Sequence, residues 1–424
     1  MKLESIALHH GYSSDPTTKA AAVPIYQTTS YTFDDTQHGA DLFDLKVTGN
    51  IYTRIMNPTT AVLEARLAEM EGGIAALCLA SGMAAITYAI QTIAGTGDNI
   101  ASVSQLYGGT YNLFMHAFPR QGIETRMFAA DDFAALEAAI DSRTKAVFLE
   151  SIGNPAGNIV DVARIAEIAH RHGVPVIVDN TVATPYLCRP FEFGADIVVH
   201  SLTKYIGGHG TTIGGAIIDS GKFDWAANKD RFAILNEPDP SYHGVVYTEA
   251  LGPAAFIGRA RVAPLRNTGA ALSPHSAFLI LQGLETLGLR MERHCANALK
   301  VAEYLKAHPK VSWVRYAALP GNEYNALARK MTGGHASGIL SFGIAGGKEA
   351  GARFIDALQM ILRLVNIGDA KSLACHPAST THRQLTDAQR DAAGAGNDVV
   401  RLSIGLEDKA DIIADLDQAL GGAA

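Results

Sequence analysis

The fold class of this chain is decided by an apolar run that ends in an acid, VPVIVDN at residues 174–180, and by a second run, ADIVVHSLTK, at residues 195–204. Both runs have the length and the β-branched content of buried strands. A helical pattern at residues 163–172 precedes the first run, and a further apolar run follows at 214–218. Strands that alternate with helices predict an α/β fold with a mostly parallel sheet covered by helices on both faces.

The same alternation extends toward the N-terminus. Helices are expected from Thr59 to the Gly72-Gly73 pair and from Met83 to about Ile93. Further short apolar strands are expected at residues 75–79, 99–103 and 145–150.

The sequence predicts a separate structural unit at each end of the chain. Residues 1–60 are irregular, and such an extended arm normally needs a surface to lie on, which is often a neighbouring subunit. A long helix at 276–307 is expected to lead into a smaller α/β domain, with strands near 311–316, 338–343 and 399–405. We therefore expect an N-terminal arm at 1–60, a large domain at 61–269 and a smaller C-terminal domain at 270–424.

The composition restricts the possible partners. The net charge of −7 over 424 residues, with scattered Lys and Arg, argues against nucleic acid. No apolar stretch reaches the roughly 20 residues of a membrane helix, and no secretory signal is visible at the start. The histidines lack metal spacing, so no metal is expected. Four widely separated cysteines indicate reduced thiols in a cytoplasmic protein; they are Cys78, Cys188, Cys295 and Cys375.

Lys204 is the strongest candidate for chemistry. It follows the strand at 195–200, after Ser201 and Thr203 and before a glycine-rich turn, and Asp179 ends the preceding strand. Taken alone, the lysine is as well explained by a solvated surface position, and the aspartate by a capped turn. Together they suit pyridoxal phosphate, because the lysine can form a Schiff base, the acid can hold the pyridinium nitrogen and the hydroxyls can bind phosphate. Ligands collect at the carboxyl ends of strands in such sheets.

Other candidates are individually weaker. Gly82 and Met83 follow Ser81 where a strand turns into a helix, which suits an anion, although for the serine taken alone an ordinary N-cap is the favoured explanation. Tyr107 could stack on a flat ring or form a turn, and Asn154 could reach a ring oxygen or form a turn.

Two arginine-containing segments complete this set. Tyr52 and Arg54 in the arm suit a phosphate, because arginine forms bidentate charge-assisted hydrogen bonds. Arg401, inside a strand pattern, needs a partner, which is either a substrate carboxylate or an internal acid.

These segments closely resemble the Cys/Met-metabolism family of pyridoxal-phosphate enzymes, of fold type I, over nearly the whole chain. The resemblance rests on segments that occur in the family's order: YTR at 52–54, ASGMA at 80–84, YGGT at 107–110, VDNT at 178–181, HSLTKY at 200–205, SLACHPASTTH at 372–382 and RLSIG at 401–405.

The resemblance implies a role for each candidate. Lys204 would bind the cofactor covalently and shuttle protons, Asp179 would hold the pyridinium nitrogen, and Tyr107 would stack on the ring. Lys204 and Tyr107 are thus the candidate catalytic residues. Asn154 would bind the phenolic oxygen of the cofactor. Gly82, Met83, Ser201 and Thr203 would bind its phosphate, joined by Tyr52 and Arg54 of an adjacent subunit; Arg401, with Ser372, would bind the substrate carboxylate. The family pattern implies a homodimer that pairs into a tetramer.

Three features bear on the choice of reaction. Lys371 stands where the cystathionine enzymes usually carry Glu, and Gly109 stands where methionine γ-lyases carry Cys. The insertion at 236–244 resembles the O-acetylhomoserine sulfhydrylases, so we expect γ-replacement of O-acetylhomoserine by sulfide or methanethiol. Methionine γ-lyase and cystathionine γ-synthase are the alternatives within the family. A nucleotide-binding dehydrogenase is disfavoured because no G-x-G-x-x-G follows the first strand, and an inactive scaffold is disfavoured because Lys204, Asp179 and Arg401 are present.

Overall fold

The computed structural model describes residues 1–422 except 45, 381–382, 384–385, 388–389 and 391–393. Its larger sheet has seven strands in the order β1-β7-β6-β5-β4-β2-β3. Among the strands that the structure describes in this sheet, only β7 runs against the common direction, so the prediction of a mostly parallel sheet is confirmed. The strands are β1 (Ala75–Leu79), β2 (Asn99–Val103), β3 (Glu124–Phe128), β4 (Thr144–Glu150), β5 (Val176–Asp179), β6 (Ile197–Ser201) and β7 (Gly215–Asp219).

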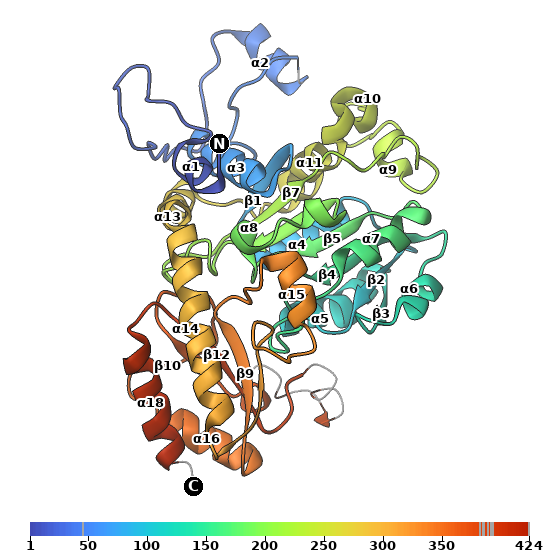
Figure 1. Ribbon diagram of the computed structural model, residues 1–424. Coiled ribbons are helices and arrows are strands. Elements are labelled where there is room, and N and C mark those ends of the chain that lie inside the picture. Colours follow the sequence, from blue (N-terminus) through green and yellow to red (C-terminus); the bar gives the residue numbers. More distant parts are fainter. Residues whose placement is uncertain (45, 381–382, 384–385, 388–389, 391–393, 423–424) are drawn as a thin grey trace.

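The sheet is flanked by helices, which are easy to follow in Figure 1. Contacts join α3 to β1 and β7, α4 to β6 and β7, and α7 to β5. Strand β3 was not predicted, because at the sheet edge its Glu124, Thr125 and Arg126 interrupt the apolar pattern. The helices of this part are α3 (Pro58–Glu71), α4 (Gly82–Gln91), α5 (Gly108–Asn112), α6 (Phe133–Ala139), α7 (Val162–Arg171) and α8 (Thr184–Leu187).

The insertion at 236–244 forms turns between two short helices, α9 (Ala233–Asn236) and α10 (Tyr247–Leu251), and α11 (Ala255–Ala260) follows. The prediction of a single helix at 276–307 is wrong. The chain forms two helices there, α13 (Pro274–Glu285) and α14 (Leu287–Ala307), with a break at Thr286. A long-range contact accompanies this break, since Gly283 lies so close to the carbonyl oxygen of Gly207 that a side chain there would clash. Sequence periodicity does not report such a contact.

A second sheet of five strands follows, in the order β10-β11-β12-β9-β8. Helix α14 packs on β8 and β9 and runs down one side of the molecule in Figure 1. The two-residue β10 and three-residue β11 were not predicted, because they are too short to carry a period. The elements are β8 (Val311–Arg315), α15 (Asn325–Thr332), β9 (Ile339–Ile344), α16 (Gly347–Ala357), β10 (Leu362–Arg363), β11 (Leu373–Cys375), β12 (Val399–Ser403) and α18 (Lys409–Gly422).

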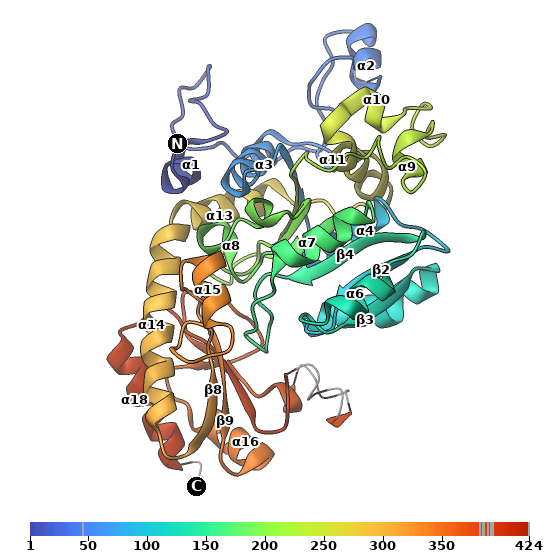
Figure 2. The ribbon, with the colours of Figure 1, turned by 45° about the vertical axis from the view of Figure 1, so that its right-hand side comes forward.

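The N-terminal segment is extended, as expected, but it contains two short helices, α1 (Leu3–His9) and α2 (Thr36–Phe43). Helix α1 packs on α3, whereas the loop that carries α2 projects from the body in both Figure 1 and Figure 2. Tyr26, Phe33 and Phe43 on this segment are exposed. In the part of the chain that the structure describes, no helix is long and apolar enough to cross a membrane.

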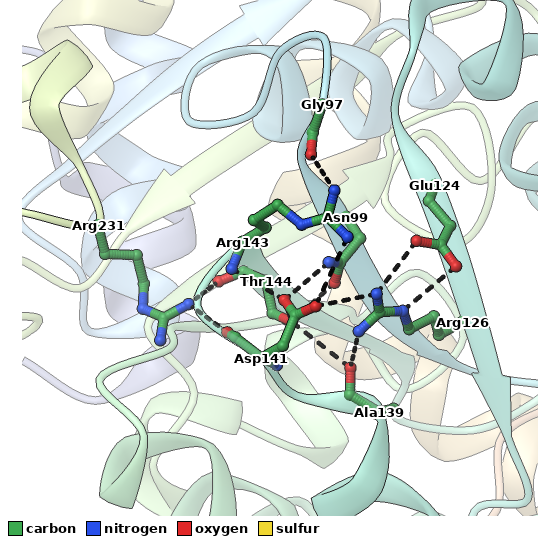
Figure 3. Close-up of polar contacts among 9 residues, drawn as sticks. All are labelled: Gly97, Asn99, Glu124, Arg126, Ala139, Asp141, Arg143, Thr144 and Arg231. Atoms are coloured by element: carbon green, nitrogen blue, oxygen red, sulfur yellow. Dashed lines mark hydrogen bonds and ion pairs between the residues drawn. The ribbon is translucent and has the colours of Figure 1, made fainter.

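A polar cluster around Asp141 joins the amino ends of β2 and β4 (Figure 3). The Asp141 carboxylate accepts hydrogen bonds from Asn99 Nδ2 at 2.9 Å and from the Arg143 amide at 2.8 Å, and it pairs with Arg126 at 3.0 Å. Arg231 donates to the carbonyl oxygens of Asp141 and Thr144 at 2.8 and 2.6 Å. The cluster therefore ties two strand starts together, at the edge opposite their carboxyl ends.

Replacing Asp141 with Asn is expected to lower stability at neutral pH by about 1 kcal/mol, because the half-exposed carboxylate loses charge-assisted hydrogen bonds. Burial opposes ionisation, but Asn99, the Arg143 amide and Arg126 together hold the pKa of Asp141 well below its usual value of 3.8. A lowered pKa stabilises the folded state above pH ~4, and this contribution is lost as the pH falls further. The free energy of unfolding in urea, compared between variant and wild type at pH 7 and pH 3, measures this contribution. The control is Glu303→Gln, which removes the exposed ion pair between Glu303 and Lys300. A deficit as large at pH 3 as at pH 7 would contradict this electrostatic account.

Candidate active site

A cavity of about 230 Å³ lies at the carboxyl ends of the central strands of the large sheet. It is lined from the first sheet by the ends of β4, β5 and β6 and by the start of α4, and from the second sheet by β12. Most of the predicted site residues line this one cavity, namely Gly82, Met83, Tyr107, Asn154, Asp179, Ser201, Thr203, Lys204 and Arg401. Residues up to several hundred positions apart are thus brought together where a parallel sheet is expected to bind ligands.

Lys204 lies in the turn after β6. Its Nζ donates a hydrogen bond to Asn366 Oδ1 at 2.5 Å. Burial, together with the positive charge of Arg401, lowers the pKa of Lys204 from 10.5 to about 8. A substantial fraction of the side chain is therefore an uncharged, nucleophilic amine near pH 8, as covalent attachment to a carbonyl requires.

The turn that contains Lys204, called the lysine turn below, is held in place by Arg290 on α14. Its guanidinium is buried and donates to the carbonyl oxygens of Tyr205 at 2.5 Å, Ile206 at 3.2 Å and Gly283 at 2.7 Å. Gly208 leaves room for this guanidinium, because a Cβ at that position would clash with it. The backbone next to Lys204 is thus fixed from the helix that leads into the second sheet.

We expect the rate at which pyridoxal phosphate attaches to the cofactor-free protein to rise between pH 7 and 9 and then to level off. The reason is that the lowered Lys204 pKa leaves little protonated amine above pH 9, whereas an ordinary lysine gains reactivity until about pH 10.4. Stopped-flow absorbance measures this rate, with N-acetyl-lysine as the control amine. A rate that still climbs at pH 10 would contradict a lowered pKa.

Asp179 ends β5 and faces the same cavity. Burial raises the pKa of its carboxyl, while hydrogen bonds from Thr181 and the charge of His200 act in the opposite direction. One oxygen, Oδ1, accepts the Thr181 amide at 3.0 Å. A half-buried acid whose ionisation is disfavoured is well suited to accept a proton or a cationic N–H from a bound ring.

The start of α4 provides room for an anion. Ser81 caps the helix, accepting the Ala84 amide at 3.1 Å, so the simple N-cap interpretation of this serine holds. Gly82 lies against Ser201, because a Cβ on Gly82 would come within 2.7 Å of the Ser201 Cβ. The first N–H groups of a helix lack partners within it, and they attract anions such as phosphate.

Tyr107 and Asn154 lie at the cavity from two different loops. Tyr107 is 44% exposed, and Asn154 is buried with its Oδ1 accepting from Arg401 Nη1 at 3.2 Å. Arg401 also donates to the carbonyl oxygen of Asn366 at 2.9 Å. Among the residues that the structure describes, these partners of Arg401 are uncharged oxygens, so the internal ion pair considered for it is not formed there.

Three predicted residues are not brought to the cavity. Tyr52 and Arg54 lie in the arm, where the Arg54 guanidinium stacks 5.2 Å from the Tyr52 ring centroid. Ser372 is buried but is not among the residues that line the cavity. Its hydroxyl donates a hydrogen bond to Glu407 at 2.9 Å and accepts one from the Gly405 amide at 2.8 Å. In this geometry the position beside Lys204 and Arg401 belongs to Asn366 instead.

Asn366 and Glu150 line the cavity but were not predicted. Glu150 ends an apolar strand just as Asp179 does, so the same strand-end argument would have found it. Asn366 carries a weaker signal, namely a single amide between Val365 and Ile367.

A partly buried lysine, a partly buried acid, a helix start and an arginine whose described partners are uncharged oxygens together define a site that fits pyridoxal phosphate. The chain belongs to the Cys/Met metabolism PLP-dependent enzyme family, whose model matches residues 4–421. Its cofactor is pyridoxal phosphate, as the sequence predicted.

Individual relatives are similar over nearly their whole length. The chain is 51% identical to a homocysteine synthase of Schizosaccharomyces pombe, over 98% of this chain and 97% of the relative. It is 51% identical to an O-acetyl-L-homoserine sulfhydrylase of Leptospira meyeri, over 99% and 96%. A crystal structure of a putative O-acetylhomoserine (thiol)-lyase from Campylobacter jejuni, which contains N'-pyridoxyl-lysine-5'-monophosphate, superposes with a TM-score of 0.97 at 46% identity, over 99% and 100%.

Proposed function

We propose that this protein catalyses γ-replacement on O-acetyl-L-homoserine, with sulfide as the nucleophile and methanethiol as an alternative. The Cγ–O bond breaks and releases acetate, and a Cγ–S bond forms to give homocysteine, or methionine with methanethiol. The observation that carries the proposal is the identity of about half the residues, over nearly the full length, to proteins named sulfhydrylase and homocysteine synthase.

When bound, pyridoxal phosphate supplies the electron sink that acidifies the Cα and Cβ hydrogens of an amino acid and lets a γ-substituent leave. The Lys204 amine takes the Cα proton and later returns a proton. Arg401 binds the substrate carboxylate, and Asn366, whose amide oxygen lies 2.5 Å from Lys204 Nζ, orients the amine. Asp179 and Asn154 hold the cofactor ring, Tyr107 stacks on it, and Gly82, Met83, Ser201 and Thr203 bind its phosphate.

Two positions support sulfide over an amino-acid thiol or simple elimination. Lys371 is exposed and pairs with Asp369 at 3.2 Å, so no acid at that position is available to bind a second amino group. A Cβ on Gly109 would come within 2.5 Å of the Tyr107 ring, so the cysteine typical of methionine γ-lyases would displace that ring here.

Several further parts of the proposal rest on the family resemblance. Tyr52 and Arg54 reach the phosphate of a neighbouring subunit, which makes the dimer obligatory, and two dimers form a tetramer. The arm at 1–60, the large domain at 61–269 and the smaller domain at 270–424 are the working units of a cytoplasmic enzyme.

Incubation of the holoenzyme with O-acetylhomoserine, with and without sulfide, tests the reaction. We expect homocysteine and acetate that appear in equal amounts and depend on sulfide. Oxobutyrate and ammonia without homocysteine would instead indicate a γ-lyase, and cystathionine from added cysteine would indicate a cystathionine γ-synthase. O-succinyl- and O-phosphohomoserine in parallel reactions identify the preferred leaving group.

A further inference from the structure

Glu150 is a buried acid that joins two loops at the cavity. It ends β4, is 4% exposed and lines the cavity. Its Oε1 accepts the backbone N–H of Tyr107 at 2.5 Å, and its Oε2 accepts the backbone N–H of Asn154 at 3.3 Å. One carboxylate therefore fixes the backbones of both residues that flank the proposed cofactor ring.

The charges around Glu150 come from several elements. Asp179 is its register partner on β5, and Lys204 and Arg401 line the same cavity from the turn after β6 and from β12. Burial and the charge of Asp179 raise the pKa of Glu150 well above its usual value, and the two N–H donors oppose this rise. His200 acts on the neighbouring Asp179.

We infer that Glu150 is a positioning residue, whose two oxygens set the placement of Tyr107 and Asn154 and thereby the affinity and orientation with which the site holds pyridoxal phosphate. The inference rests on the cofactor and on these two contacts. The positioning role of Glu150 is independent of which acyl group leaves and which nucleophile adds. The positioning role can therefore be disproved while the proposed reaction stands, and the proposed reaction can be disproved while the positioning role stands.

Only a side chain with two acceptor oxygens at this distance meets both amides. Glutamine keeps the shape but offers an NH₂ group to one of the two N–H donors, and aspartate keeps the carboxyl group but is one methylene too short to reach both. A buried amide that loses its acceptor is costly, so either change moves the loop that loses its partner.

The test measures cofactor binding rather than turnover alone. In Glu150→Gln and Glu150→Asp we expect the Kd of pyridoxal phosphate, measured by titrating the cofactor-free protein, to rise about ten-fold. The visible circular dichroism of the bound cofactor should weaken, because it reports the orientation of the ring. Wild-type affinity together with wild-type dichroism in either variant would overturn the inference.

Asp219→Asn is a matched control. Asp219 is also a buried carboxylate that accepts two backbone amides, from Gly221 at 2.9 Å and Ile257 at 3.3 Å, but it does not line the cavity. This variant should keep the wild-type Kd and dichroism. An equal loss in Asp219→Asn would show that removing any buried acid loosens the sheet, and it would overturn a specific role for Glu150.

Two further measurements separate positioning from folding. Glu150→Gln should weaken binding less in a Tyr107→Ala background than in the wild type, because part of its effect acts through Tyr107; strictly additive losses would contradict this. Hydrogen exchange by mass spectrometry on the unmodified protein needs no variant: the Tyr107 and Asn154 amides should be protected. Fast exchange at both would overturn the inference even if neither variant folds.

Discussion

Replacing Lys204 with alanine is expected to lower kcat for the replacement reaction by at least about 10³-fold, because one side chain supplies both the covalent anchor and the proton transfer. The fold should survive, since among the described residues Nζ makes a single hydrogen bond, to Asn366. Borohydride treatment of the wild type should leave a pyridoxyl group on the peptide that contains Lys204. The alanine variant should bind pyridoxal phosphate only reversibly and remain unlabelled.

Lys300→Ala is the matched control for this experiment. Lys300 lies on α14 and is half-exposed, and its pair with Glu303 is of a kind that contributes little. Its removal should leave both kcat and borohydride labelling unchanged. Undiminished turnover in Lys204→Ala would refute the assignment of Lys204, whatever the identity of the substrate.

Most of the large sheet could be predicted because its strands are continuous apolar runs that end in polar residues. Asp179 and Lys204 each follow such a run, and parallel strands bring their carboxyl ends to one edge. The edge strand β3 and the break at Thr286 were not predicted. The reason is that the polar residues of an edge strand, and the contact between Gly283 and Gly207, can be understood only once the chain is folded.

The site was less predictable where irregular segments contribute to it. Asn366 lies in no strand, and its place beside Lys204 depends on how the segment before β11 crosses the lysine turn. The resemblance pointed to Ser372 nearby, whose hydroxyl instead supports the turn at Gly405. Residues in such connecting segments have no periodicity from which their direction can be inferred. The SLACHPASTTH segment ends at residues 381–382, outside the described residues.

Replacing Arg401 with lysine is expected to reduce kcat/KM for O-acetylhomoserine about 100-fold and to leave the affinity for pyridoxal phosphate nearly unchanged. The Arg401 guanidinium is buried, and its described partners are the neutral oxygens of Asn154 and Asn366. We therefore expect a substrate carboxylate to be the anion that pairs with this guanidinium. Lysine keeps the charge but loses the planar fork that binds a carboxylate through two parallel hydrogen bonds.

Arg401→Met separates the charge from this fork. Because the Arg401 charge contributes to the lowered pKa of Lys204, its removal should move the pH dependence of cofactor attachment upward, whereas Arg401→Lys should leave that dependence close to pH 8. Arg164→Lys, in the exposed pair with Glu167, should change neither kcat/KM nor the pH profile. If Arg401→Met lost substrate affinity without any shift in the profile, Arg401 would bind substrate but would not tune the lysine; if kcat/KM survived in both variants, the carboxylate would have to be bound elsewhere.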